Sequence, residues 1–105
     1  MVRISVIIPV YNRAGVVLAT LASVAAQTSR DFELILIDNN STDDTLAVLG
    51  RWSDSMADSG LTIRILECST PGASAARNIG LAAASAPWTM FFDSDDTMRP
   101  NHIAR

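Results

Sequence analysis

Short apolar segments recur along the chain, each followed by polar residues and then by a helical pattern, and this alternation leaves few architectures open. The segments are rich in β-branched, aliphatic and aromatic residues and span 4–10, 32–37, 62–66 and 88–92. The first two are almost continuously hydrophobic, which is typical of strands buried on both faces of a parallel sheet. Strand and helix patterns in strict alternation imply right-handed crossovers. We therefore predict an α/β fold with a mostly parallel sheet and flanking helices.

The segments between these strands carry helical signals. Apolar residues at helical spacing span 16–24. Before the second helix, Ser41 to Asp44 offers N-caps, Asp43 and Asp44 suit a first turn, and an apolar stripe then runs to Met56. The third segment, 73–84, is rich in alanine. Gly80 is its weak point, because glycine costs about 1 kcal/mol relative to alanine inside a helix.

Length and composition exclude several classes of protein. The 105 residues carry a formal net charge of −3, and every basic residue is arginine. A chain this long forms one domain at most, and its acidity disfavours a protein that coats nucleic acid. The absence of lysine removes Schiff-base and Walker-type chemistry, while a single cysteine, Cys68, and a single histidine, His102, exclude an internal disulfide and a Cys/His zinc cluster. Without a signal-peptide or membrane-spanning pattern, we expect a soluble cytoplasmic chain.

Polar residues follow every predicted strand. They form the runs Tyr11-Asn12-Arg13, Asp38-Asn39-Asn40-Ser41, Ser69-Thr70-Pro71-Gly72 and Asp93-Ser94-Asp95-Asp96. In open parallel sheets, ligands bind in the crevice beyond the carboxyl ends of the strands. These widely separated runs should therefore meet at one rim of the sheet and form one binding site.

The acidic run places three carboxylates within residues 93–96. Like charges this close need a positive partner, and oxygen ligands without cysteine or histidine favour Mg²⁺ or Mn²⁺ over zinc. A solvated acidic turn that caps a following helix explains the same residues equally well. This run alone leaves metal binding and capping open.

Two other features also have both a binding and a structural interpretation. The segment 38–41 could hydrogen-bond the edge of a flat heterocycle, although an Asx-turn with an N-cap is the more common use of such residues. Arg77 lies near the start of the third helix, from where it could reach a phosphate or a base. A surface arginine is the plainer interpretation of that residue.

Four motifs, which include the segments above, occur in order along nearly the whole chain. They are Ile8-Pro-Val-Tyr-Asn12, Asp38-Asn-Asn-Ser-Thr-Asp-Asp-Thr45, Gly72-Ala-Ser-Ala-Ala-Arg-Asn-Ile-Gly80 and Phe92-Asp-Ser-Asp-Asp96. Together they resemble the successive motifs of family-2 glycosyltransferases, which are inverting enzymes of GT-A fold. The resemblance implies that residues 1–105 form the N-terminal, Rossmann-like part of a glycosyltransferase domain, which binds the nucleotide-sugar.

The resemblance also implies roles at the nucleobase. The residues that match Pro9, Tyr11 and Asn12 line the base pocket in the family, and those that match Asp38 and Asn39 meet the edge of the base. Many family members have a second aspartate where this chain has Asn39. The amide oxygen can still accept a hydrogen bond from uracil or thymine N3–H, and the amide nitrogen adds a donor for a neighbouring carbonyl. The implied donor is a UDP-, GDP- or dTDP-sugar.

At the anionic end of the donor, the resemblance implies that Arg77 helps to hold the nucleotide. Asp95 and Asp96 would hold the ribose and a Mg²⁺ or Mn²⁺ ion, with Asp95 nearer the ribose and Asp96 nearer the metal. Asp93 would support them or also lie near the nucleotide. The metal would stabilise charge on the leaving diphosphate. An acceptor hydroxyl would attack the opposite face of the anomeric carbon, assisted by a carboxylate base.

In the family, the general base and the acceptor-binding region follow the acidic motif, so we expect them beyond Arg105. We expect the isolated chain to lack turnover for that reason. The implied acceptor is a saccharide or a lipid-linked saccharide, and no nucleic-acid partner is expected. Association with the inner face of a membrane would depend on segments outside this chain.

Other functional classes compete with this interpretation. A dinucleotide-dependent dehydrogenase requires G-x-G-x-x-G after the first strand, and the sequence there is Tyr11-Asn-Arg-Ala-Gly. A receiver-like signalling domain usually has a lysine at the rim, which this chain lacks. A nucleotide-binding or regulatory module without catalysis stays open as the alternative.

Overall fold

Strands and helices alternate along the chain, as the apolar pattern predicts. The computed structural model describes residues 3–27 and 31–94. Within these ranges the elements are β1 (Ile4–Val10), α1 (Val17–Ala25), β2 (Phe32–Asp38), α2 (Thr45–Ser55), β3 (Thr62–Glu67), α3 (Ala73–Ala83) and β4 (Trp88–Phe91). None of the helices in the described part of the chain is long and apolar enough to cross a membrane.

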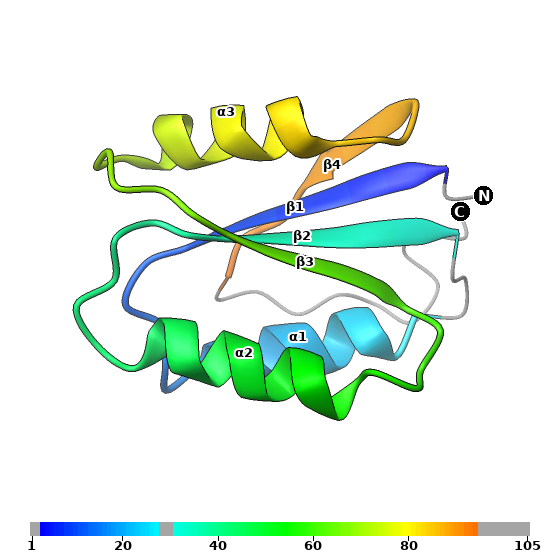
Figure 1. The fold of residues 1–105 in the computed structure, drawn as a ribbon, viewed down its shortest axis with the longest axis horizontal. Coiled ribbons are helices and arrows are strands. Elements are labelled where there is room, and N and C mark those ends of the chain that lie inside the picture. Colours follow the sequence, from blue (N-terminus) through cyan, green and yellow to red (C-terminus); the bar gives the residue numbers. More distant parts are fainter. Residues whose placement is uncertain (1–2, 28–30, 95–105) are drawn as a thin grey trace.

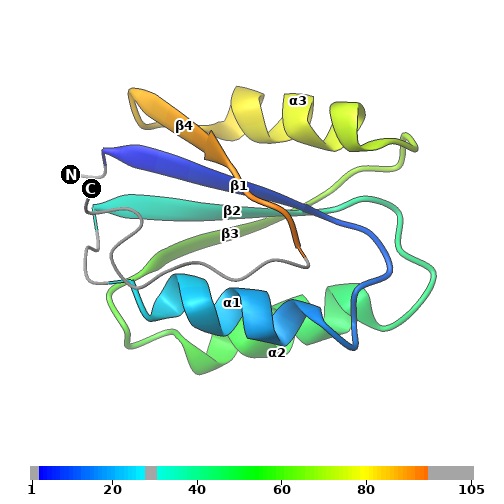
Figure 2. The same cartoon turned by 180° about the vertical axis from the view of Figure 1, so that it is seen from behind.

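The strands form one parallel sheet in the order β3-β2-β1-β4. Helices α1 and α2 cover one face of the sheet and α3 covers the other (Figures 1 and 2). Strands β1, β2 and β3 lie side by side in sequence order. Helix α3 then connects β3 to β4, which pairs with β1 on its other side. The strand order therefore reverses between β1 and β4, and the predicted α/β fold with a parallel sheet and flanking helices is confirmed.

The central strands are buried on both faces, which explains their continuous hydrophobicity. In β1, Val6, Ile8 and Val10 pack into the cluster that includes the buried residues of α1 and α2. Ile7 lies between them on the opposite face and packs with the buried Ala76 of α3. The edge strands β3 and β4 are more exposed, because each has only one neighbouring strand within the described residues.

Helix α2 begins directly after the predicted capping run, with Asp44 at the N-cap position. It starts at Thr45, so Asp43 and Asp44 precede the helix, and the prediction that they occupy its first turn is wrong. Asp43 stabilises this helix start from the loop, because its carboxylate accepts hydrogen bonds from the Thr45 backbone N–H (2.9 Å) and the Thr45 hydroxyl. The hydroxyl bond from Thr45 is the main cause that lowers the pKa of Asp43 below its ordinary value.

Gly80 has a packing role that propensity alone does not reveal. A Cβ atom at this position would lie 2.5 Å from Ile7 Cγ2 and 3.0 Å from Ile37 Cδ1. The weak point of the alanine-rich helix is therefore a place where α3 lies too close to the sheet for a Cβ atom to fit without a shift. This close approach sets the position of the helix that bounds the functional site.

A buried carboxylate fastens the connection between α3 and β4 to the sheet. Glu33 of β2 is buried and accepts hydrogen bonds from the Ser5 hydroxyl (2.6 Å) and from both the backbone N–H and the hydroxyl of Ser85 (2.8 Å each). Burial by itself would raise the pKa of Glu33, but these bonds and the positive charge of Arg64 lower it below the ordinary value. These hydrogen bonds therefore favour the ionised form of Glu33 inside the apolar run of β2.

Candidate functional site

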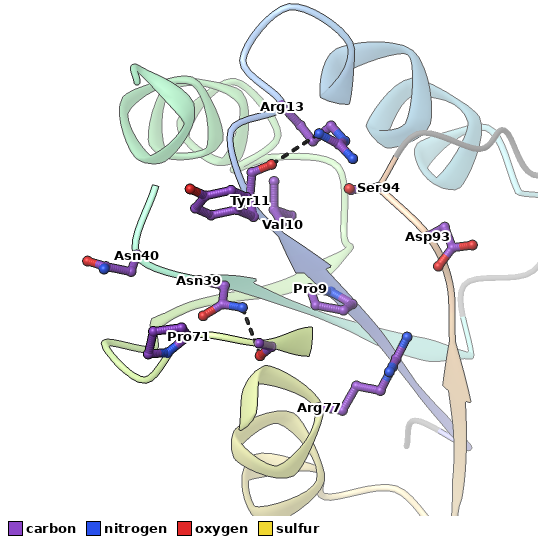
Figure 3. Close-up of a pocket in the computed structure, with 11 residues that line it drawn as sticks. Pro9, Val10, Tyr11, Arg13, Asn39, Asn40, Pro71, Arg77, Asp93 and Ser94 are labelled. Atoms are coloured by element: carbon purple, nitrogen blue, oxygen red, sulfur yellow. Dashed lines mark hydrogen bonds between the residues drawn. The ribbon is translucent and has the colours of Figure 1, made fainter. Parts of the chain in front are cut away.

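A cavity of about 580 Å³ opens at the carboxyl edge of the sheet, where the strand order reverses. Its walls come from the end of β1 and the loop after it, the residues after β2, the residues before α3 and one residue of that helix, and the residues after β4 (Figure 3). The lining residues are Pro9, Val10, Tyr11, Arg13, Asn39, Asn40, Pro71, Gly72, Arg77, Asp93 and Ser94. Ligand cavities in proteins usually enclose about 300–1,000 Å³. The size and the position at a topological switch point both suit a small-molecule ligand.

The wall beside β1 offers flat apolar surfaces. Pro9 is half-buried, and Tyr11 is 52% exposed, so part of its ring is open to contact. Asn12 follows with a left-handed backbone (φ 48°) and does not line the cavity. Its side chain accepts from the Thr42 backbone N–H (2.8 Å) and donates to the Thr42 hydroxyl (3.2 Å). Asn12 thus joins the loop after β1 to the loop after β2.

Asn39, which directly follows β2 and lines the cavity, has a buried and unused hydrogen-bond acceptor. The residue is only 6% exposed, and its Nδ2 donates to the Gly72 carbonyl (2.8 Å), as Figure 3 shows. Its Oδ1 has no hydrogen-bond partner within the described part of the chain. A buried polar atom without a partner costs free energy. The Gly72 carbonyl engages the amide nitrogen, so the oxygen is the atom left to accept from a ligand.

Asp38 lies on the other face of the strand end. It is buried and lines a smaller cavity of about 270 Å³ together with Asp43 and Glu67. One of its oxygens, Oδ1, has no partner among the residues that the structure describes. Asp38 does not line the larger cavity, which is bounded by its neighbour Asn39.

Two arginines lie on opposite sides of the larger cavity (Figure 3). Arg13 Nη1 donates to the carbonyls of Tyr11 (3.3 Å) and Asn12 (3.5 Å). Arg77 extends from α3, and its Cζ lies 5.9 Å from the centre of the Phe91 ring. Neither guanidinium has a carboxylate partner within residues 3–27 and 31–94, so both charges are available to an anion.

Asp93 and Ser94 form the wall beyond β4. Asp93 is exposed, and the Ser94 carbonyl accepts a hydrogen bond from the Thr20 hydroxyl of α1 (2.8 Å). The predicted metal and ribose ligands Asp95 and Asp96 lie outside the described residues. The described residues alone contain no group of three or more His, Cys, Asp or Glu that could hold a metal ion.

The structure brings together five of the predicted site residues, namely Pro9, Tyr11, Asn39, Arg77 and Asp93. It does not place Asn12 or Asp38 in the cavity wall, and the contacts predicted between these two residues and a base stay predictions. The sequence did not single out the other six residues that line the cavity, which are Val10, Arg13, Asn40, Pro71, Gly72 and Ser94. Val10 ends β1, and the remaining five belong to the polar runs that follow the strands, so the runs as a whole indicated the site.

An open parallel sheet with a cavity at its switch point is the arrangement of nucleotide-binding α/β proteins. Residues 5–105 match the family model described as Glycosyl transferase family 2, and the chain belongs to this family. An uncharacterized glycosyltransferase of Rickettsia felis is 38% identical over 101 residues, which are 96% of this chain and 16% of that protein.

Solved glycosyltransferase structures share the fold. The crystal structure of S. aureus TarS 1-349 in complex with UDP superposes with a TM-score of 0.85 and 28% identity, over 97% of this chain and 30% of that one. The mannosyltransferase PcManGT from Pyrobaculum calidifontis, in complex with GDP-Man and Mn²⁺, gives a TM-score of 0.82 and 28% identity, over 89% of this chain and 27% of that one. The chain thus spans less than a third of either solved structure.

Proposed function

We propose that this chain forms the donor-binding part of an inverting, metal-dependent glycosyltransferase that uses a nucleoside diphosphate sugar. The chain spans 16–36% of the curated relatives it matches. We therefore propose that the acceptor site and the general base lie in the portion of such proteins that this chain does not match. The acceptor we propose is a saccharide or a lipid-linked saccharide.

The observation that carries this proposal is the buried, unpartnered Oδ1 of Asn39 in the cavity wall. A fixed acceptor opposite the ring nitrogen of the Watson–Crick edge selects bases in which that ring nitrogen carries a hydrogen, which are uracil and thymine through N3–H and guanine through N1–H. Cytosine N3 and adenine N1 are themselves acceptors and would face the Asn39 oxygen with a lone pair. The open ring of Tyr11 gives the base a surface on which to stack.

The anionic part of the donor would lie toward Arg77 and Asp93. Arg77 suits a phosphate because its guanidinium carries a full charge and presents several donors in one plane. Asp93, Asp95 and Asp96 supply the hard carboxylate oxygens that Mg²⁺ or Mn²⁺ prefers, and the relative with GDP-Man contains Mn²⁺. When bound, such an ion stabilises negative charge on the leaving diphosphate.

Calorimetry with UDP, GDP, dTDP, CDP and ADP, each with and without Mn²⁺, tests the proposal. We expect the first three nucleotides to bind more tightly than CDP and ADP by about tenfold or more, because a mismatched base leaves a buried acceptor unsatisfied. Mn²⁺ should strengthen binding.

Asn39→Leu should abolish the preference among bases, since it removes the acceptor. Asn78→Leu is the matched control, because Asn78 is an exposed residue of α3 that does not line the cavity. Failure of every nucleotide to bind, even with Mn²⁺, would contradict the donor-site assignment. Equal binding of CDP and UDP would contradict the role of Asn39.

A further inference from the structure

Phe91, the last residue of β4, lies against the functional site without lining it. In the sheet register Phe91 is the partner of Ile7, which packs on the side of α3. Side chains of paired residues share a face of the sheet, so the Phe91 ring also faces α3. The ring is still 43% exposed, so packing of the core does not account for an aromatic residue here.

The contact that Phe91 makes is with the Arg77 guanidinium. The Arg77 Cζ lies 5.9 Å from the ring centre, which is within reach of a cation–π interaction. Arg77 has no carboxylate or hydrogen-bond partner within the described ranges, and Figure 3 shows its side chain extending from α3 toward Pro9 and the cavity. Within the described residues, the Phe91 ring is therefore the one specific contact of the guanidinium.

We propose that Phe91 is a positioning residue that holds the Arg77 guanidinium over the cavity, ready to bind the anionic part of a nucleotide. This inference rests on the proposed nucleotide-binding function. An unrestrained arginine side chain samples many rotamers and loses that freedom when it binds a ligand. A ring beneath the guanidinium limits those rotamers beforehand, so less freedom is lost on binding. The ring also leaves the N–H donors free at the edges of the guanidinium plane.

The positioning itself can be tested without ligand, by NMR of the arginine Nε–Hε groups. A proton above an aromatic ring is shielded, so the Arg77 Hε should resonate upfield of the other arginines. Arg77→Lys assigns the signal by removing it. Phe91→Leu should return the signal to the range of the others, and Trp88→Leu should leave it unchanged, because Trp88 is an exposed aromatic residue on the same strand. If Phe91→Leu left the chemical shift of the Arg77 Hε unchanged, the proposal would be overturned.

The effect on binding is tested by a double-mutant cycle with the nucleotide that binds the unchanged chain most tightly. Phe91→Leu should weaken binding about two- to fivefold, the range expected for a cation–π contact near the surface, and Phe91→Tyr should restore it because the ring is kept. In an Arg77→Ala background, Phe91→Leu should have no further effect.

The possible failures are distinct from one another. If the unchanged chain binds no nucleotide, the proposed function fails, and the NMR shift still decides whether Phe91 positions Arg77. If nucleotide binds and Phe91→Leu binds equally well, the positioning role is wrong. A loss of the same size in the Arg77→Ala background would also overturn it, because Phe91 would then act independently of Arg77.

Discussion

Replacing Gly80 with alanine tests whether packing enforces the close approach of α3 to the sheet. The new Cβ would lie 2.5 Å from Ile7 Cγ2 and 3.0 Å from Ile37 Cδ1. Both isoleucines are fully buried in the two central strands, and β-branched side chains have few alternative rotamers. The added methyl group must therefore push the helix outward or strain the central strands.

Two opposing contributions determine how much Gly80→Ala should change the free energy of unfolding. Overpacking a core typically costs about 1–3 kcal/mol, while alanine in place of glycine favours a helix by about 1 kcal/mol. Gly50 of α2 provides a matched control, because a Cβ there would meet nothing within 4 Å. Gly50→Ala should therefore stabilise the chain by about 1 kcal/mol. The propensity term is common to both variants, so the difference between them measures the clash alone, about 1–3 kcal/mol.

Urea denaturation of the two variants and the unchanged chain gives the free energies of unfolding. Gly80→Ala should be less stable than Gly50→Ala by about 1–3 kcal/mol. It should also weaken nucleotide binding, because α3 carries Arg77 and begins beside Gly72 in the cavity wall. If Gly80→Ala stabilised the chain as much as Gly50→Ala, the reasoning that α3 is held against the sheet at Gly80 would be refuted.

Further predictions concern the two polar links that fasten loops to the sheet. The folded-state pKa of Glu33 is lowered from 4.5, so its stabilising effect is present above that pH and is lost as the pH falls through the folded-state pKa. Glu33→Gln should flatten this acid-induced loss in urea denaturation measured between neutral and acidic pH, and an unchanged slope would rule out Glu33 as its source. Asn12→Gly should cost about 1 kcal/mol by removing the bonds to Thr42, and Asn12→Ala about 1 kcal/mol more, because alanine is strained at positive φ. Equal stability of these two variants would contradict the role of the left-handed backbone.

The order and spacing of the elements were predictable from the sequence, because they depend on local periodicity and on the handedness of crossovers. The strand at Ile4–Val10 has the predicted bounds, and the third helix ends one residue earlier than predicted, at Ala83. The first turn of α2 was mispredicted, because Asp43 can serve a helix either from within its first turn or from the loop before it. Which of these occurs depends on the path of the loop, and that path includes the bond between Asn12 and Thr42.

The rim of the site was also predictable, since the topology of a parallel sheet brings all carboxyl strand ends to one edge. The sequence did not reveal which of Asp38 and Asn39 lines the larger cavity, because neighbouring residues at a strand end point to opposite faces. Asp38 lies in the smaller cavity with Asp43, whereas Asn39 bonds to Gly72 in the larger one. The roles of Gly80, Glu33 and Phe91 likewise depend on contacts between residues far apart in the sequence. Local patterns specify where the chain turns and what it buries, but only packing decides which polar groups are left to meet a ligand.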